Sequence, residues 1–281
     1  MKKAFKLKLF VVTTITFLFL FSSYMYAQHV DNSATVANIS DQLNKTEVIK
    51  PQNSSSNQSR SVKKLYLKAI IEGFYNYSTN TMNKTHDVSL PSYNIVPVFP
   101  GAIVDTLSVI INYVDTINGV AICYSNIYPN VTFDTNGVIA PITVLNTDTA
   151  KFYIMISHRS SIDTWSAVRF KLYGNDSISY DFTNSVTKAF GNNQKLITPN
   201  KAAIFSGEVG DLYSPYNDGV INIYDLSAVY DAINDNSGMM NIGYSMQDLN
   251  GDGVVNMLDM VIVFDNLNLG VASVFPPGLC N

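Results

Sequence analysis

Oxygen-bearing side chains alternate along residues 248–259 in the spacing that a calcium loop requires. Calcium takes about six to eight oxygen ligands, and a short loop surrounds it only when the ligands alternate and a glycine permits a sharp bend. Gly253 supplies that bend at loop position 6. Positions 1, 3, 5, 9 and 12 hold Asp248, Asn250, Asp252, Asn256 and Asp259. The spacing predicts a calcium site.

The same pattern occurs a second time upstream. Residues 218–226 align with residues 252–260 at an offset of 34, and the similarity continues through the hydrophobic positions that follow. In the first copy the candidate ligands are Asp218, Asn222 and Asp225. The alternative is that two Asp/Asn-Gly turns arise by chance in a chain rich in these residues. A fixed offset that extends beyond the loops favours two copies of one loop–helix unit that pack against each other.

These duplicated loops, each ending in Asp where an EF-hand has Glu, resemble the dockerin type I family. The resemblance covers Gly207 to Asn268. It implies that each loop binds one calcium ion, and that the partner is a cohesin-like or cell-surface protein. In the second loop it implies side-chain ligation by four residues, a carbonyl ligand at Val254 and a water-mediated contact at Asn256. The four side-chain ligands are Asp248, Asn250, Asp252 and Asp259.

The first loop departs from the family pattern upstream of Gly219. Counting back from this glycine places Ser214 at position 1 and Tyr216 at position 3, and neither is a good ligand. Asp211 lies three residues before Ser214, where dockerins usually have the first ligand, so a three-residue insertion would restore it. We expect a degenerate site at Asp211, Asp218, Asn222 and Asp225.

The residues after each loop predict an amphipathic helix. Apolar residues recur three and four positions apart, which places them on one helical face, expected to form the core shared by the two copies. These residues are Ile223, Leu226, Val229, Tyr230 and Ile233, with Met257, Met260, Val263, Phe264 and Leu267. The resemblance also implies partner selection at loop positions 10 and 11, which are Ile223, Tyr224, Met257 and Leu258. Ile223 and Met257 have the alternative of a purely core role.

Charge is distributed unevenly along the 281 residues. The whole chain has 18 Lys and Arg against 22 Asp and Glu, but four lysines lie in the first eight positions. From Ala202 to Asn281 there are ten acidic residues and no Lys or Arg. Such a segment would repel nucleic acid, which argues against a nucleic-acid partner and favours a bound cation.

The N-terminus has the outline of a secretory signal peptide. A lysine-rich start precedes the apolar run 9–21, and cleavage after Ala27 is expected. The alternative is a retained membrane anchor, although the apolar run is short for a membrane span. We therefore expect a secreted protein, extracellular or at the cell surface, with no transmembrane span after signal removal. Residues 28–64 are polar and predict a flexible linker. The sequence leaves open whether Cys123 and Cys280 pair.

Residues 65–200 predict a mainly β domain, an antiparallel β-sandwich that precedes a small α-helical dockerin-like domain at 202–275. Short runs rich in β-branched and aromatic residues alternate with turn residues, and no long helical period separates them. The strand candidates are 65–74, 106–114, 120–128, 151–157, 167–173 and 177–182. This region is similar to a β-rich module of secreted Bacteroidetes proteins, a similarity that transfers no chemistry.

Catalytic motifs are not recognisable in the β region. There is no Gly-x-Ser-x-Gly sequence, and His158 beside Ser160 and Ser161 favours turn stabilisation over catalysis. Trp165 and the tyrosines could stack on sugar rings or peptide, but a buried aromatic core is favoured. We expect a non-catalytic protein that docks onto its partner in polysaccharide degradation or adhesion. The alternatives are a glycoside hydrolase or other degradative hydrolase carrying a dockerin, and an adhesin or carbohydrate-binding protein.

Overall fold

A computed structural model describes residues 63–89, 94–117, 120–144, 151–171, 177–210, 218–235 and 242–279. The chain divides into residues 1–59, none of which is described, and one compact unit at residues 60–281. The expected signal peptide, residues 28–62 of the expected linker, Asp211 and Cys280 lie outside the described residues, as does the side chain of Cys123. The expected domain boundaries and the pairing of the cysteines stay predictions.

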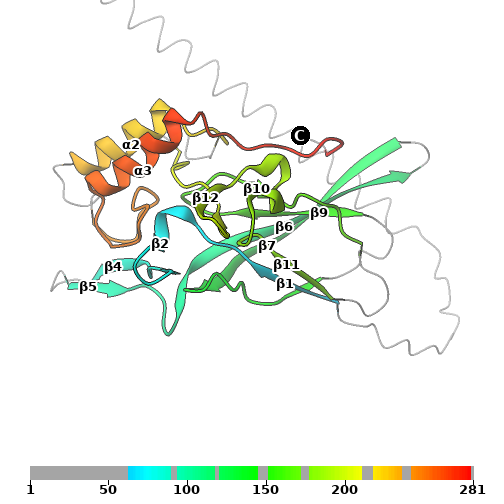
Figure 1. Ribbon diagram of the computed structural model, residues 1–281, viewed down its shortest axis with the longest axis horizontal. Helices are drawn as coiled ribbons and strands as arrows, with labels where there is room; N and C mark the ends of the chain where they lie inside the picture. The colour runs from blue at the N-terminus through cyan, green and yellow to red at the C-terminus, as the bar shows by residue number, and fades with distance from the viewer. Residues whose placement is uncertain are drawn as a thin grey trace, which may run out of the picture. The chain divides into compact units, whose positions relative to one another are not determined.

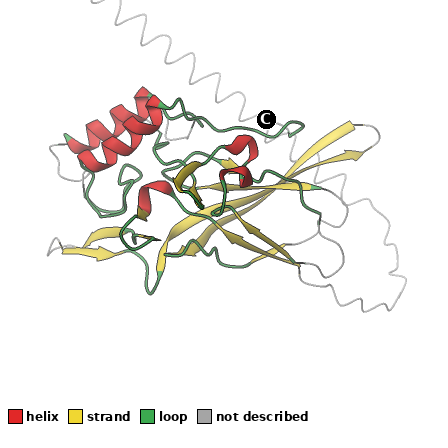
Figure 2. Ribbon diagram, viewed as in Figure 1, coloured by secondary structure: helices red, strands yellow, loops and turns green. Residues whose placement is uncertain are grey.

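Strands dominate the compact unit, and two helices follow near the C-terminus (Figures 1 and 2). The largest sheet has the antiparallel order β10 (Thr164–Trp165), β9 (Phe152–Ser157), β6 (Ile103–Ile117), β7 (Val120–Asp134). A second sheet has the order β11 (Ile178–Asp181), β1 (Lys63–Lys68), β8 (Ile142–Val144). In it β1 pairs with β8 antiparallel and with β11 parallel.

The remaining elements are short. Three two-stranded ladders pair β2 (Tyr75–Asn76) with β3 (Thr81–Met82), β4 (His86–Ser89) with β5 (Asn94–Pro97), and β12 (Lys195–Thr198) with β13 (Lys201–Ala203). The single-turn helices are η1 (Glu72–Phe74), η2 (Val186–Lys188) and η3 (Phe190–Asn192). The two α-helices are α2 (Ile223–Ile233) and α3 (Met257–Asn268). The prediction of a mainly β chain with a small helical part at its C-terminal end is confirmed.

Two of the strand predictions were wrong in detail. The first expected strand, 65–74, ends at Lys68, and the chain then turns through η1. Residues 167–171 form no strand and make only a single bridge between Phe170 and Phe152. The Val168 side chain is exposed and adds nothing to the core that a strand here would pack against. Residues 172–173 of this expected strand lie outside the described part of the chain.

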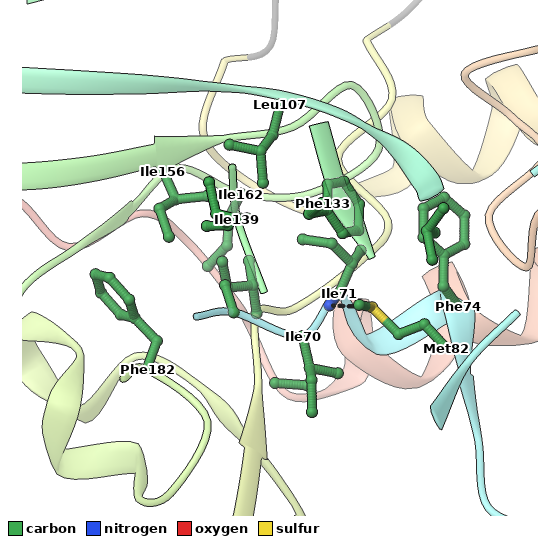
Figure 3. Packing of buried hydrophobic residues seen from close by; sticks show 14 of the residues in the cluster. Ile70, Ile71, Phe74, Met82, Leu107, Phe133, Ile139, Ile156, Ile162 and Phe182 are labelled. Carbon is green, nitrogen blue, oxygen red and sulfur yellow. Dashed lines mark hydrogen bonds between the residues drawn. The ribbon is translucent and has the colours of Figure 1, made fainter. Parts of the chain in front are cut away.

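One apolar core joins both larger sheets. Alternate residues of β1 (Leu65 and Leu67) are buried in the same cluster as residues of β6 and β9. Figure 3 shows Ile71, Phe74 and Met82 beside Phe133 in this cluster, with the Ile71 backbone N–H donating to the Met82 sulfur at 3.4 Å. Buried residues of the helical part, including Val229 and Val263, belong to it as well. The helices therefore share a continuous core with the β part.

Candidate metal centres and docking face

The second loop folds around the carboxylate of Asp248, which is fully buried. Its Oδ1 accepts the Gly251 N–H and its Oδ2 accepts the Gly253 N–H, both at 2.9 Å. Gly253 has φ +86°, a left-handed conformation that glycine adopts without a Cβ penalty. The expected ligand at position 1 thus organises the bend at position 6.

Asp259, the expected last ligand, closes the loop onto α3. Its Oδ1 accepts the N–H groups of Leu249 and Asn250 at 2.8 and 3.1 Å, and its Oδ2 accepts the Asn256 N–H at 2.9 Å. Asn256 caps α3 by accepting the Leu258 N–H, so loop and helix form one hydrogen-bonded unit. Asp252 and Asn250 complete the loop, since Asp252 accepts the Asn250 side-chain amide at 3.0 Å.

Calcium fits this loop on the chemistry of its donors. The expected ligands offer only oxygen atoms, which suit a hard cation. Burial raises the pKa of Asp248, and burial with the charge of Asp248 raises the pKa of Asp259 to about 6 despite hydrogen bonds from the backbone. A bound cation would stabilise both carboxylates in their charged form. Among the described residues no group of three or more His, Cys, Asp and Glu is placed to hold a metal, and the expected donor set includes amide and carbonyl oxygens.

The first loop reproduces the downstream half of the second. Asp225 Oδ2 accepts the Asn222 N–H at 2.8 Å, as Asp259 accepts the N–H of Asn256. Asn222 caps α2 through the Tyr224 N–H, and its side-chain amide donates to the Val220 carbonyl and to Asp218. The structure therefore brings together three of the four expected residues, Asp218, Asn222 and Asp225, while the fourth lies outside the described residues.

The upstream half of this loop contains an acidic residue that the sequence analysis missed. Glu208 is 1% exposed, and its Oε1 accepts the Asp218 N–H at 3.2 Å. Burial, with the charges of Asp225 and Asp218, raises the pKa of Glu208 to about 8. A signal was present in the sequence, because Glu208-Val209 pairs with Asp248-Leu249 at an offset of 40. An alignment at the offset of 34, which holds from Asp218 onward, does not pair Glu208 with Asp248.

The helices expose a face that repeats from one copy to the other. Ile223 and Tyr224 open α2 with exposed fractions of 61 and 64%, and Met257 and Leu258 open α3 with 62 and 63%. Tyr230 and Phe264 continue this docking face one to two turns later and are also exposed. The helices lie side by side in Figure 1.

The prediction that all ten apolar helical positions form the core was therefore wrong for four of them. Val229 and Val263 are fully buried, and the residues partly buried against the core are Leu226, Ile233, Met260 and Leu267. The four exposed positions are Ile223, Tyr230, Met257 and Phe264. Helical periodicity places the apolar residues on one broad face. Only the inner part of this face packs against the core, and the outer part is exposed to solvent.

Comparison with known families matches residues 216–268 to the dockerin type I domain. This segment contains both α-helices and the whole of the second loop. It is a dockerin type I domain. The resemblance stated from the sequence is confirmed for this segment. No curated protein and no solved structure matches the chain.

A dockerin type I domain implies calcium binding and docking onto a cohesin, and proteins that carry one are typically extracellular or at the cell surface. In the described residues no helix is long and apolar enough to cross a membrane.

The dockerin domain is attached to the β part through its second calcium loop. His86 Nδ1 donates to the Gly251 carbonyl at 2.8 Å. Arg159 donates to the Ser245 carbonyl, lies 4.5 Å from the Tyr244 ring centroid and pairs with Asp105 at 3.0 Å. These contacts place residues 244–251 directly on the side chains of the β part.

A buried polar network forms a second attachment. Asn266, on the inner face of α3, donates through Nδ2 to Glu72 Oε2 and to the Ser206 carbonyl, both at 2.7 Å. Glu72 in turn pairs with Lys195 of β12. Because Asn266 and Ser206 are fully buried and the Glu72 side chain is nearly so, the network fixes how α3 sits on the β part.

His158, Ser160 and Asp105 form a linear arrangement that resembles a hydrolytic triad. Ser160 Oγ lies 3.2 Å from His158 Nδ1, and His158 Nε2 lies 3.4 Å from Asp105 Oδ2. All three are buried, and the imidazole packs edge-on against Phe74 and Phe133. Burial outweighs the Asp105 contact and lowers the pKa of His158. A nucleophile must reach its substrate, so this geometry supports a role in packing.

Trp165 belongs to the aromatic interior. It is 6% exposed and packs with Tyr153, Met155 and Leu279, while Phe275 lies 6.1 Å from its ring. The favoured expectation of a buried aromatic is therefore right for Trp165. The C-terminal segment runs back along the β part (Figure 1), where Leu279 packs against the Trp165 cluster.

Proposed function

We propose that this chain is a secreted, non-catalytic protein whose dockerin domain docks, in a calcium-dependent manner, onto a cohesin-like or cell-surface partner. The assembly would serve polysaccharide degradation or adhesion. The observation that carries the proposal is the docking face, because each calcium loop presents a pair of exposed apolar residues at positions 10 and 11. Those pairs are Ile223-Tyr224 and Met257-Leu258. Exposed apolar residues clustered beside an ordered metal loop suit a protein interface.

Calcium would act on the face through the loops. Asn222 and Asn256 both belong to a loop and cap the helix that carries the exposed pair. When bound, the ion supplies positive charge to the buried carboxylates of the loop. The caps then hold the first turn of each helix, so the apolar pair is presented in one orientation.

The test is binding of the chain from Gln28 onward to a panel of immobilised cohesin domains, with calcium and with a chelator. The double variant Tyr224→Asp/Leu258→Asp should lose binding, because it introduces charge into both copies of the face. Asp is tolerated in a first helical turn, so the variant should fold. The matched control is Leu196→Asp, which changes an equally exposed leucine on β12 and should bind like the parent.

Binding that survives the double variant, or that ignores calcium, would contradict the docking proposal. The non-catalytic assignment has its own test, an assay of the same protein against glycans and peptides. Turnover that is lost in Ser160→Ala but retained in the exposed-site control Ser227→Ala would overturn it in favour of a hydrolase.

A further inference from the structure

We propose that Glu208 is the position-1 ligand of the first calcium loop, completing a site with Asp218, the Val220 carbonyl, Asn222 and Asp225. This rests on the calcium-dependent function proposed for the dockerin domain. The family match begins at residue 216 and does not include Glu208. The site would take a divalent cation of the calcium type, because every donor is an oxygen atom.

Backbone hydrogen bonds establish the equivalence of the two loops. The Val209 N–H donates to Asp225 Oδ1 at 2.9 Å, and the Leu249 N–H donates to Asp259 Oδ1 at 2.8 Å. Val209 and Leu249 are both fully buried. The residue immediately before each of them therefore occupies the same place against the last ligand of its loop. That residue is Asp248 in the second loop and Glu208 in the first.

The Glu208 carboxylate accepts a backbone hydrogen bond from its own loop, as expected of a residue at loop position 1. Its Oε1 accepts the backbone N–H of Asp218, much as Asp248 accepts backbone N–H groups at positions 4 and 6 of its own loop. Its Oε2 is buried and accepts no well-formed hydrogen bond from the described residues, because the nearby Val220 N–H donates to Asp218 Oδ1 at 2.8 Å and interacts only weakly with the Glu208 carboxylate. A buried carboxylate oxygen without a partner is costly, and a cation would compensate for it.

The distance along the chain explains why the site is not visible as a regular motif. Ten positions separate Glu208 from Asp218, whereas four separate Asp248 from Asp252, so the first loop is six residues longer. The entropic cost of closing a loop grows slowly with its length, so a loop that is six residues longer can still bring its ends together. The longer side chain of glutamate extends the reach of its carboxylate by one methylene group.

The experiment is calorimetric titration of the chain from Gln28 onward with calcium, which measures both the number of ions and their affinities. We expect two ions for the parent. Glu208→Gln keeps the size of the side chain and removes its charge. It should weaken one site by about 100-fold or more, since even the loss of an outer-shell partner costs roughly 10–100-fold. The matched variant Asp248→Asn should weaken the other site, and Glu208→Asp should retain two ions with a weaker first site.

Three results would overturn the assignment. One is an unchanged two-ion titration in Glu208→Gln. Another is loss of the first site in Asp211→Asn while Glu208→Gln keeps it. The third is a parent that binds one ion, lost in Asp248→Asn alone, which refutes the role of Glu208 and leaves calcium binding by the domain intact. A parent that binds no calcium would instead refute the proposed function itself. Circular dichroism of each variant checks that α2 and α3 remain folded.

Discussion

Replacing Asn266 by alanine should destabilise the whole compact unit, because this buried side chain joins α3 to the β part. The change removes the hydrogen bonds that Asn266 donates to the Glu72 carboxylate and to the Ser206 carbonyl, and a longer one of 3.3 Å that it accepts from Lys195. A bond to a charged group contributes about 1.5–3 kcal/mol and a neutral one about 0.5–1.5 kcal/mol. We expect a loss of about 3 kcal/mol, which for a unit of this size lowers Tm by about 6–12 °C.

Two spectroscopic probes separate the parts of the unit. Trp165 is the single tryptophan and reports on the β part through its fluorescence, whereas circular dichroism at helical wavelengths reports on α2 and α3. Asn266→Ala should lower the transition seen by both probes equally, since the helices and sheets share one core. The control is Asn268→Ala, an exposed position on the same helix, which should leave Tm within about 1–2 °C of the parent.

Either of two results would contradict this prediction. A helical signal that melts well below the tryptophan signal in the parent would show that the dockerin domain unfolds by itself. A Tm for Asn266→Ala equal to that of Asn268→Ala would show that the buried network adds nothing to stability.

Three further predictions concern the metal, the pH and the junction. Chelation should destabilise the parent by about 2.7 kcal/mol for each site that calcium occupies at 100 times Kd, and a calorimetric Tm unaffected by chelator would contradict this. Burial raises the pKa of Asp105, but contacts with His158, Arg159 and Tyr244 outweigh it and lower the pKa to about 2. Because the folded value lies below the ordinary 3.8, the stabilisation of about 2 kcal/mol is complete above pH 4 and lost as the pH falls toward 2. About 1 kcal/mol of this should be lost between pH 5 and pH 3, so the decrease in urea stability between these two pH values should be larger by about that amount in the parent than in Asp105→Asn. Gly73→Ala would place a Cβ 2.1 Å from the Leu249 carbonyl oxygen, so Tm should fall by an amount equivalent to about 1–3 kcal/mol. Gly101→Ala meets nothing within 4 Å, bears only the cost of its positive φ and should change Tm less.

Local spacing was enough to predict the fold of the second loop and the presence of a helix in each copy. The bonds that form the loop join residues within about one loop length, such as Asp248 with Gly253 and Asp259 with Asn250. Such contacts depend on residue types at fixed short separations, which a sequence displays directly. The caps are equally local contacts, although Asn222 and Asn256 were predicted as ligands and not as caps: each accepts the N–H of the residue two positions ahead.

The extra residues in the first loop prevent a prediction from fixed short spacing. Counting back from Gly219 arrives at Ser214, because a fixed offset cannot represent a loop that is six residues longer than its copy. Only the folded chain shows that Glu208 accepts the Asp218 N–H and that the Val209 N–H donates to Asp225. The strand predicted at residues 167–171 was wrong because composition alone does not supply a pairing partner. Among the described residues, this segment pairs only through the bridge between Phe170 and Phe152.

Residue types and short-range spacing establish the acidic C-terminal segment, the oxygen donors at calcium spacing and the two copies of one loop–helix unit. Tertiary structure decided which surfaces these units use. Helical periodicity groups Ile223 with Val229, but packing against the β part buries Val229 and leaves Ile223 for a partner. Glu72 and Asn266 lie 194 positions apart and meet only in the folded chain. Contacts at that separation depend on how whole elements pack, and no short-range pattern in a sequence encodes them.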